Sequence, residues 1–520
     1  MNALPLPAGF GRSALSNSVY TILLAVVALV VTPILTGRLG PERYGIWVLV
    51  VSTLAYVELL DVGLGGAVVS FVARFSAAGD EDAVMQTIST SFFVLVVLGL
   101  VALGLIAVGA LVLPGAVHLR APMVGTTRLL LLLLGVDAAV SLPMDTFGCG
   151  LVALQRFDLL NASLIVGTVL QAVAWTVVLL TGGGLLLLGV VTVAISLSGQ
   201  AVRLVMLRHL LPELSISPRL VNRETLRLLA RPAGWFALAG SVDGFRDYAN
   251  TLVLSVVRNV ATAGVYAVGE KMATLGTKFG MAVADPYFPH AASLVGRGDG
   301  EGLRRATTSG NRIAAGVIMP CCLVIAVFAR PALDAWVGRS FERATPAVII
   351  LAISASLASF DAIPFKIVSG SGGQRLLSLM GLAEAATDIV LTAVLGYYFG
   401  LIGVAVALLA TVVVVEIGVC LPLVCRRLNV RIHDLFLPVL RAHAVPLAVA
   451  GTAGGFLSAG PVTSFVDVHG RVANLAVVAA ASMAVLTLYA TIFAVTGLDS
   501  ASRHAVVARV PLVGHRAGTP

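Results

Sequence analysis

The chain has 520 residues, of which 58% are hydrophobic and only 12% charged, and its formal net charge is +8. Soluble domains are nearer half apolar and a quarter charged, so this composition excludes an ordinary soluble domain and indicates a polytopic membrane protein. The positive charge comes almost entirely from arginine, without a basic and aromatic patch. We therefore expect arginine clusters in loops beside the membrane and no nucleic-acid partner.

Apolar stretches of about 20 residues, the length that crosses a bilayer as a helix, recur along the whole chain. They predict an all-α integral membrane protein with about fourteen transmembrane helices. The predicted helices lie at 16–37, 44–67, 86–113, 128–152, 159–181, 184–208, 233–257, 262–290, 308–330, 343–369, 376–398, 400–425, 437–459 and 472–497.

An internal repeat divides these helices. The segments 36–50 and 255–269 each place an arginine, a short polar link and then Gly-aliphatic-aromatic at the start of a helix. Gly182 also precedes Arg208 by the same distance as Gly400 precedes Arg426. The repeat predicts two six-helix lobes with a pseudo-symmetry axis along the membrane normal, an arrangement known in transporters. The predicted parts are an N-terminal segment (1–15), a first lobe (16–208), a linker (209–232), a second lobe (233–425), two additional helices (426–497) and a tail (498–520).

The arginine-rich loops predict the orientation, because basic residues accumulate on the cytoplasmic side. They place both termini in the cytoplasm. The linker region 211–234 has arginines and leucines near helical spacing, which suggests an amphipathic helix on the membrane surface. A charged linker that only fixes topology explains the same pattern, and both interpretations stay open.

Charged residues inside apolar segments suggest a polar interior, because a charge at mid-bilayer is costly unless it faces a cavity or a partner. Lys271, Lys278 and Asp285 follow at seven-residue intervals and share one helix face. Further charges at helical spacing form a set that one water-filled interior would accommodate: Asp243, Arg246 and Asp247, then Glu58 and Asp61, then Glu384 and Asp388.

Five stretches resemble a known family: LGPERYGIWVLVVSTLAYVELLDVGLGGAVVSFVARF (39–75), DYANTLVLSVVRNVATAGVYAVGEKM (247–272), FPHAASL (288–294), ALDAWVGRSFERA (332–344) and KIVSGSGGQR (366–375). They are similar to bacterial polysaccharide flippases, the O-antigen and exopolysaccharide translocases. These belong to the superfamily of lipid II flippases and multidrug and toxin extrusion (MATE) antiporters. The resemblance covers roughly residues 13–430. It implies a MATE-like or lipid II flippase-like two-lobed bundle in the bacterial cytoplasmic membrane. By alternating access, the bundle would move an undecaprenyl-diphosphate-linked oligosaccharide to the outer leaflet during polysaccharide biosynthesis, with a polysaccharide polymerase or other assembly proteins as partners.

A diphosphate is a dense anion that requires cationic donors in a desolvated site. We therefore expect Arg246, Lys271, Lys278 and Lys366 to contact it. The alternative is local neutralisation by neighbouring acids. Transport also needs a source of energy, and buried carboxylates that exchange H⁺ or Na⁺ would supply it. The candidate acids are Asp61, Asp243, Asp247, Glu270 and Glu416, which would otherwise hold helices together or balance basic residues.

Other functions fit less well. A membrane polymerase or glycosyltransferase is expected to carry catalytic residues on a sizeable external loop, and the predicted external loops are short. The sequence shows no metal-ligand spacing, no phosphate-binding loop and no nucleophile motif, so we expect no enzyme activity and no cofactor. A lipid II-type flippase shares the anionic head group and stays open. A cation-coupled multidrug antiporter is expected to have an acidic, aromatic-lined pocket instead of basic groups.

Overall fold

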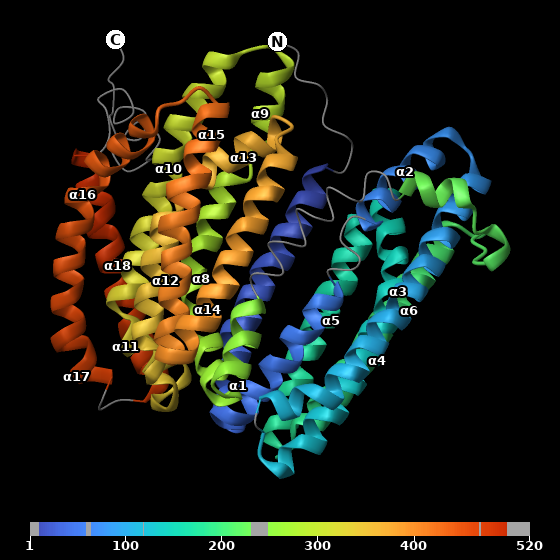
Figure 1. Ribbon diagram of the computed structural model, residues 1–520, viewed down its shortest axis with the longest axis horizontal. Coiled ribbons are helices and arrows are strands. Elements are labelled where there is room, and N and C mark those ends of the chain that lie inside the picture. The colour runs from blue at the N-terminus through green and yellow to red at the C-terminus, as the bar shows by residue number, and fades with distance from the viewer. Residues whose placement is uncertain (1–9, 59–63, 118, 230–247, 467–469, 497–520) are drawn as a thin grey trace, which may run out of the picture. The chain divides into compact units, whose positions relative to one another are not determined.

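The computed structural model describes residues 10–58, 64–117, 119–229, 248–466 and 470–496, and the regular elements within them are helical (Figure 1). Eleven helices among these residues are long and apolar enough to cross a membrane. The predicted all-helical membrane fold is confirmed. The count of fourteen spans stays a prediction.

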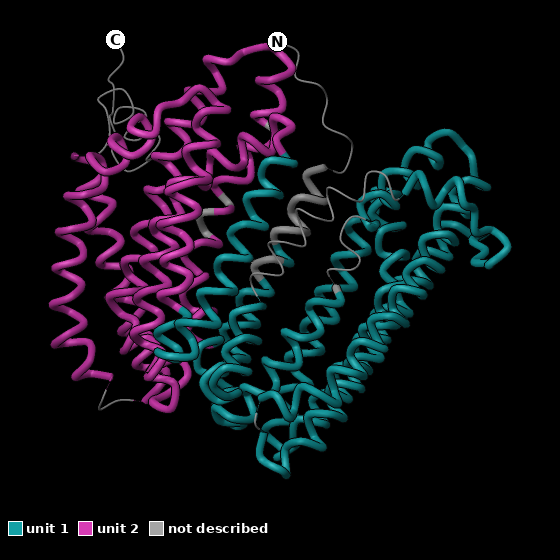
Figure 2. The backbone as a smooth tube through the Cα atoms, viewed as in Figure 1, with its two compact units in different colours: residues 1–267, 374–404 teal, residues 268–373, 405–520 magenta. Residues whose placement is uncertain are grey.

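The chain divides into two compact units, coloured separately in Figure 2. Unit 1 comprises residues 1–267 and 374–404, and unit 2 comprises residues 268–373 and 405–520. These units do not follow the two predicted lobes, because the predicted second lobe contributes to both of them. The lobe division therefore stays a prediction.

Unit 1 contains the first helices of the chain and two later ones. They are α1 (Phe10–Glu58), α2 (Leu64–Ala78), α3 (Glu81–Ala116), α4 (Ala121–Ala153), α5 (Phe157–Leu180), α6 (Leu185–Leu210), the short η1 (Pro218–Leu220), the helix Tyr248–Val257 and most of α14 (Gln374–Thr411).

Unit 2 contains the remaining elements, and α8 (Val260–Ala284) begins in unit 1 and continues into it. The others are α9 (Tyr287–Gly296), α10 (Gly300–Val327), α11 (Ala329–Val337), η2 (Arg339–Ala344), α12 (Thr345–Ala358), α13 (Ala362–Gly370), the π-helix η3 (Val412–Cys420), α15 (Leu421–Arg427), α16 (Ile432–Leu457), the π-helix η4 (Ser458–Val462), α17 (Thr463–Val466) and α18 (Arg471–Thr496).

Two long helices start with the same turn chemistry. Gly79 before α3 and Gly298 before α10 have φ of +71° and +67°, a conformation that glycine adopts without a Cβ penalty. The next residue in each case is an aspartate, Asp80 or Asp299. Its carboxylate accepts a hydrogen bond from the backbone N–H three residues on, at 2.9 and 2.7 Å. Each aspartate therefore satisfies a free N–H at the helix start.

Other left-handed residues recur with the same offset. Gln155 and Gly372 form one further pair, and Gly182 and Gly400 form another. The members of all three pairs are 217 to 219 residues apart. Because left-handed positions occur where the chain must turn, these pairs mark equivalent turns in the two halves of the sequence. They support the predicted repeat, including its match of Gly182 with Gly400.

The repeat segments also meet. In unit 1, Gly45 and Gly264, which are themselves 219 residues apart, pack backbone to backbone. A Cβ on Gly45 would lie 1.8 Å from the carbonyl oxygen of Val260, and a Cβ on Gly264 would lie 2.8 Å from the Cα of Gly45. Glycine is therefore required at both positions for α1 and α8 to approach this closely.

Two predicted spans are divided by the structure. The span 262–290 ends at Ala284, and α9 starts after Pro286, which has no N–H to continue the helical ladder. The span 343–369 is interrupted between Ala358 and Ala362. Pro364 lies in the first turn of α13, where a missing N–H is tolerated, and in one uninterrupted helix its ring would clash with the carbonyl four residues earlier.

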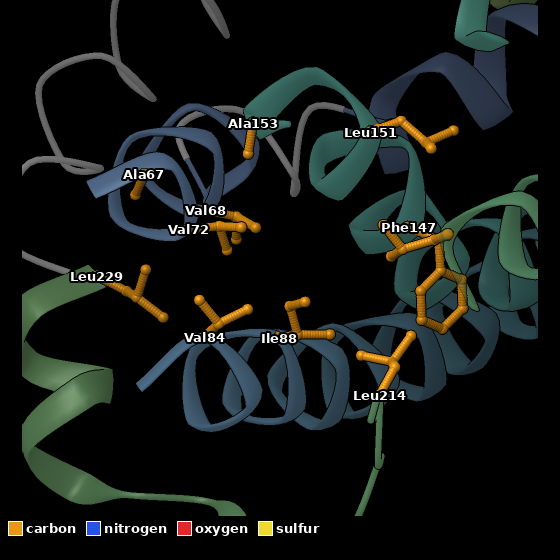
Figure 3. Close-up of a cluster of buried hydrophobic side chains, with 11 residues drawn as sticks. Ala67, Val68, Val72, Val84, Ile88, Phe147, Leu151, Ala153, Leu214 and Leu229 are labelled. Atoms are coloured by element: carbon orange, nitrogen blue, oxygen red, sulfur yellow. The ribbon is translucent and has the colours of Figure 1, made fainter. Parts of the chain in front are cut away.

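The linker after α6 packs into unit 1. Leu214 and Leu229 are buried in a cluster with Val84 and Ile88 of α3 and with residues of α2 and α4 (Figure 3). Asn222 adds hydrogen bonds from its backbone N–H to Thr90 and from its side chain to Gln86, both on α3. The described linker residues therefore cover the first turns of α3, with the short η1 and a separate helical stretch at 223–229.

In unit 2, α10, α16 and α18 share an apolar core that includes Val324, Ala450 and Val485. A buried histidine joins the same three helices. His443 of α16 lies 2.7 Å from the hydroxyl of Tyr489 on α18 and 3.2 Å from the carbonyl oxygen of Arg312 on α10. The two helices predicted as an addition to the second lobe are thus integrated into this unit.

Candidate functional site

The three lysines lie in unit 2. Lys271 and Lys278 are exposed on α8. Lys366, on α13, forms an ion pair with Asp285, its Nζ 2.8 Å from the Oδ1. The structure therefore brings together two of the predicted polar residues, Lys366 and Asp285. An anion that binds Lys366 has to compete with this carboxylate.

The predicted acidic residues that the structure describes lie on two different elements. Glu270 is half-buried on α8, and Glu416 is 6% exposed within the π-helix η3. π-Helices are rare and are often found at functional sites. The remaining candidates, Asp61, Asp243, Arg246 and Asp247, lie outside the described residues.

A cavity of about 530 Å³ lies within unit 1. Its volume falls in the range of about 300–1,000 Å³ that small-molecule sites occupy. The lining comes from α1, α4, α5, α6 and the start of the helix Tyr248–Val257: Trp47, Val51, Leu54, Ala55, Val57, Leu134, Asp137, Ala138, Ser141, Leu142, Asp145, Trp175, Thr192, Ser196, Gln200 and Tyr248.

The polar wall of the cavity is built by α4 and α6, which pack side by side (Figure 1). Asp137, Ser141 and Asp145 follow at four-residue intervals on α4, so they share one helix face. Ser196 of α6 lies beside Asp137, and its hydroxyl oxygen lies 3.4 Å from that of Ser141. These contacts hold the α4 face against α6.

The second carboxylate has a cationic partner. Arg203, one turn beyond the lining on α6 and 13% exposed in its side chain, places Nη2 3.8 Å from the Oδ1 of Asp145. The side chain of Gln200 also lies beside Asp145. Asp145 is thereby balanced in charge, whereas Asp137 has a neutral hydroxyl as its neighbour.

Two acceptor atoms of this wall are buried without a hydrogen-bond partner in the described part of the chain. Gln200 is 3% exposed and lines the cavity, and its Oε1 has no hydrogen-bond partner among the described residues. The same holds, within the described part of the chain, for Oδ1 of Asp137. Buried polar atoms are nearly always hydrogen-bonded, so two orphan acceptors in one cavity indicate a place where water or a ligand donates.

Two tryptophans form an aromatic part of the cavity lining, in contrast to the polar wall. Trp47 of α1 and Trp175 of α5 meet edge to face, with ring centroids 5.3 Å apart and an interplanar angle of 88°. Trp175 donates its Nε1–H to the hydroxyl of Thr192 at 3.0 Å, and this hydroxyl in turn donates to the backbone of α6. The indole is therefore fixed in orientation, and the surface it offers to the cavity is its ring.

Sequence reasoning missed this cavity. Asp137, Ser141 and Asp145 repeat every four residues within the predicted span 128–152, and this spacing could have identified the polar face. Gln200 and the tryptophans carry no comparable signal, because each stands alone in its helix and meets the others only in the folded chain.

The fold has solved relatives with low sequence identity. An inward-facing MATE family multidrug resistance transporter of the MOP (multidrug/oligosaccharidyl-lipid/polysaccharide) superfamily matches with a TM-score of 0.68 at 16% identity, covering 80% of this chain and 98% of that one. The lipid II flippase MurJ in an inward closed conformation matches with a TM-score of 0.61 at 10% identity, covering 92% and 98%. A MOP superfamily transporter from Pyrococcus furiosus, described by the reverse polarity of its binding pocket, matches with a TM-score of 0.52 at 14% identity, covering 80% and 93%.

These likenesses establish the predicted MATE-like and lipid II flippase-like fold. A comparison with curated protein sequences gives no match. The family model described as "Polysaccharide biosynthesis protein" matches residues 10–293, which are 284 of the 520 residues. The chain therefore belongs to the polysaccharide biosynthesis protein family and has the fold of the MOP superfamily transporters, as its sequence predicted.

Proposed function

We propose that this protein is a flippase of the bacterial cytoplasmic membrane, and not an enzyme. Its substrate is an undecaprenyl-diphosphate-linked oligosaccharide repeat unit, moved from the inner to the outer leaflet by alternating access during polysaccharide biosynthesis. The observation that carries this proposal is the family match over more than half of the chain. Other assembly proteins, such as a polysaccharide polymerase, would act on its product.

The polar head group prevents such a lipid from crossing the bilayer without a protein. Sugars and diphosphate lose their hydrogen bonds to water when they enter hydrocarbon, and each unsatisfied polar group costs several kcal/mol. A polar cavity among membrane helices replaces those bonds. The cavity of unit 1, with its carboxylates, hydroxyls and amide, supports this role.

We assign the diphosphate to the basic residues of the predicted set. Lys271 and Lys278 are exposed on α8, which suits contact with an anion that must also leave. Lys366 is the weaker contact, because Asp285 neutralises it. Arg246 is assigned to the same set from the sequence alone, because it lies outside the described residues.

We assign ion coupling to the acids. Glu416, buried in a π-helix, combines low exposure with irregular backbone, the setting in which a carboxylate exchanges H⁺ or Na⁺. Asp61, Asp243, Asp247 and Glu270 are the other candidates. None of these residues identifies the coupling ion.

A second function is favoured by one observation. The unit 1 cavity is acidic and aromatic, the chemistry expected for a multidrug antiporter that binds organic cations. The basic residues of the predicted set argue against this alternative, but those that the structure describes do not line the cavity. A lipid II-type flippase also remains compatible, since its substrate carries the same diphosphate.

The lysine assignment predicts weaker binding of diphosphate lipids to the double variant Lys271→Ala/Lys278→Ala. Loss of two charge-assisted contacts is expected to lower the affinity for undecaprenyl diphosphate at least about tenfold. Native mass spectrometry of the detergent-purified protein, titrated with this lipid, measures the change. The control is Arg223→Ala/Arg227→Ala, which removes two exposed positive charges from the linker of unit 1.

The outcomes separate the proposals. If wild type binds no diphosphate lipid but binds ethidium, the antiporter function replaces the flippase function. If wild type and the lysine variant bind equally, the flippase function stands and the lysine assignment is wrong. Translocation itself is checked in proteoliposomes, where wild type should expose fluorescent undecaprenyl-diphosphate N-acetylglucosamine from the inner leaflet to an external quencher.

A further inference from the structure

We propose that the cavity of unit 1 binds a neutral sugar ring of the lipid-linked head group, while the diphosphate is held elsewhere. This inference rests on the flippase function proposed above. It assigns a specific part of the substrate to Asp137, Gln200 and Trp175.

In the described part of the chain, the cavity wall has hydrogen-bond acceptors that lack donors. The two orphan atoms of the wall, Oδ1 of Asp137 and Oε1 of Gln200, are both acceptors. An ionised diphosphate also offers only acceptors, so these atoms would repel it. A sugar ring carries several hydroxyl donors, and a hydroxyl that meets each orphan would satisfy a buried group that otherwise costs about 1–3 kcal/mol.

The two tryptophans add an aromatic surface to the cavity. Because the Nε1–H of Trp175 is already donated to Thr192, the indole has no polar group left for a ligand. Its π face carries negative partial charge, which attracts the C–H face of a pyranose ring. Trp47 packs against it edge to face and keeps it in place. The cavity thus offers an aromatic surface and a wall of acceptors, which match the two kinds of surface on a sugar.

Charge in the cavity wall is acidic. Among the residues that the structure describes, the lining contains two carboxylates and no lysine or arginine, and the nearby Arg203 is engaged with Asp145. Within the same described residues no basic side chain pairs with Asp137, so a sugar acid would be repelled. The hydroxyl of Ser196 lies beside Asp137, and the adjacent Gln200 is neutral. A hexose or N-acetylhexosamine brings hydroxyl donors to both acceptors and has no negative charge, so it is the sugar that we assign, and an organic cation is the competing ligand.

The test compares two lipids that differ only in the sugar. Undecaprenyl-diphosphate N-acetylglucosamine and undecaprenyl diphosphate are titrated by native mass spectrometry onto wild type, Asp137→Asn, Gln200→Met and Trp175→Leu. Each variant is expected to lose about tenfold in affinity for the sugar-bearing lipid, the effect of one charge-assisted hydrogen bond or one stacking contact. Affinity for the bare lipid should stay within about twofold.

Ser198→Ala is the matched control, because this residue is exposed on α6 two positions before Gln200 and does not line the cavity. Gln200→Met keeps the length of the side chain, and binding of the bare lipid shows that each variant is folded. A double cycle with Lys271→Ala should be additive, since the two sites would hold different parts of the lipid.

Four results would overturn the assignment in different ways. If the cavity variants weaken both lipids alike, the cavity holds the diphosphate. If they weaken neither, the sugar is bound elsewhere, and the flippase function still stands. If ethidium displaces the sugar-bearing lipid from wild type and Asp137→Asn abolishes ethidium binding, the cavity is a cation site. If wild type binds neither lipid, the proposed function itself fails.

Discussion

Gly45 and Gly264 show how a single atom decides helix packing. A Cβ at Gly45 would overlap the carbonyl oxygen of Val260, and backbone cannot move aside as a flexible side chain would. The contact brings α1, which carries Trp47 two residues later, against the first turns of α8. A methyl group here would therefore shift a helix that also forms the wall of the cavity.

We expect Gly45→Ala to destabilise the protein by about 1–3 kcal/mol, the usual cost of forcing extra volume into a packed site. Thermal unfolding in detergent, followed by intrinsic fluorescence, measures the change. Gly104→Ala on α3 is the control, since no atom lies within 4 Å of the Cβ it would add. An unfolding midpoint unchanged in Gly45→Ala but lowered in the control would contradict this account.

At the scale of elements, His443 connects α16 to α18 and to α10. Both ring nitrogens have a partner, the hydroxyl of Tyr489 and the carbonyl of Arg312. The rings of Tyr489 and Phe493 stack near the imidazole, with centroids 6.3 and 4.7 Å away. One side chain therefore supplies polar and aromatic contacts to three helices whose other contacts are mainly aliphatic.

Replacing His443 with alanine should lower the free energy of unfolding by about 1–3 kcal/mol or more, because two buried polar groups lose their partner. Tyr489→Phe removes one of the two bonds and should cost less. Denaturant or thermal unfolding of the purified protein orders the variants. His433→Ala, an exposed histidine on α16, should leave the transition unchanged. Equal effects of the His433 and His443 variants would show that the bridge contributes nothing.

At the scale of the whole molecule, sequence patterns predicted the helices far better than the site. Apolar length and the repeat identified the membrane fold, because a bilayer fixes how long a spanning helix must be. Pro286 and Pro364 mark places in the sequence where a helix can bend, yet the predicted spans run through both, and the structure breaks these spans at 285–286 and 359–361. The cavity required Trp47, Asp137, Trp175 and Gln200 to meet, and their contacts depend on tertiary packing that no local period encodes.

Topology is the prediction that belongs to this scale. Arginine placement puts both termini in the cytoplasm and the loop at 181–184 outside. A C-terminal green fluorescent protein fusion should fluoresce in a bacterial host, and alkaline phosphatase fused after Gly183 should be active. Phosphatase fused after Leu220, in the linker, is the control and should be inactive. If green fluorescent protein at the C-terminus does not fluoresce and alkaline phosphatase fused at the C-terminus is active, the C-terminus lies outside the cytoplasm and this prediction is wrong.

The close contact of Gly45 with Gly264 also has a meaning in terms of symmetry. Each residue of this contact is the repeat equivalent of the other, 219 positions along the chain. In homodimers, a residue that faces its own copy lies on the two-fold axis, and the contact around it is isologous. Here one chain makes such a contact with itself. The two glycines therefore belong to a single self-complementary surface, as they would if each half of the sequence were a subunit.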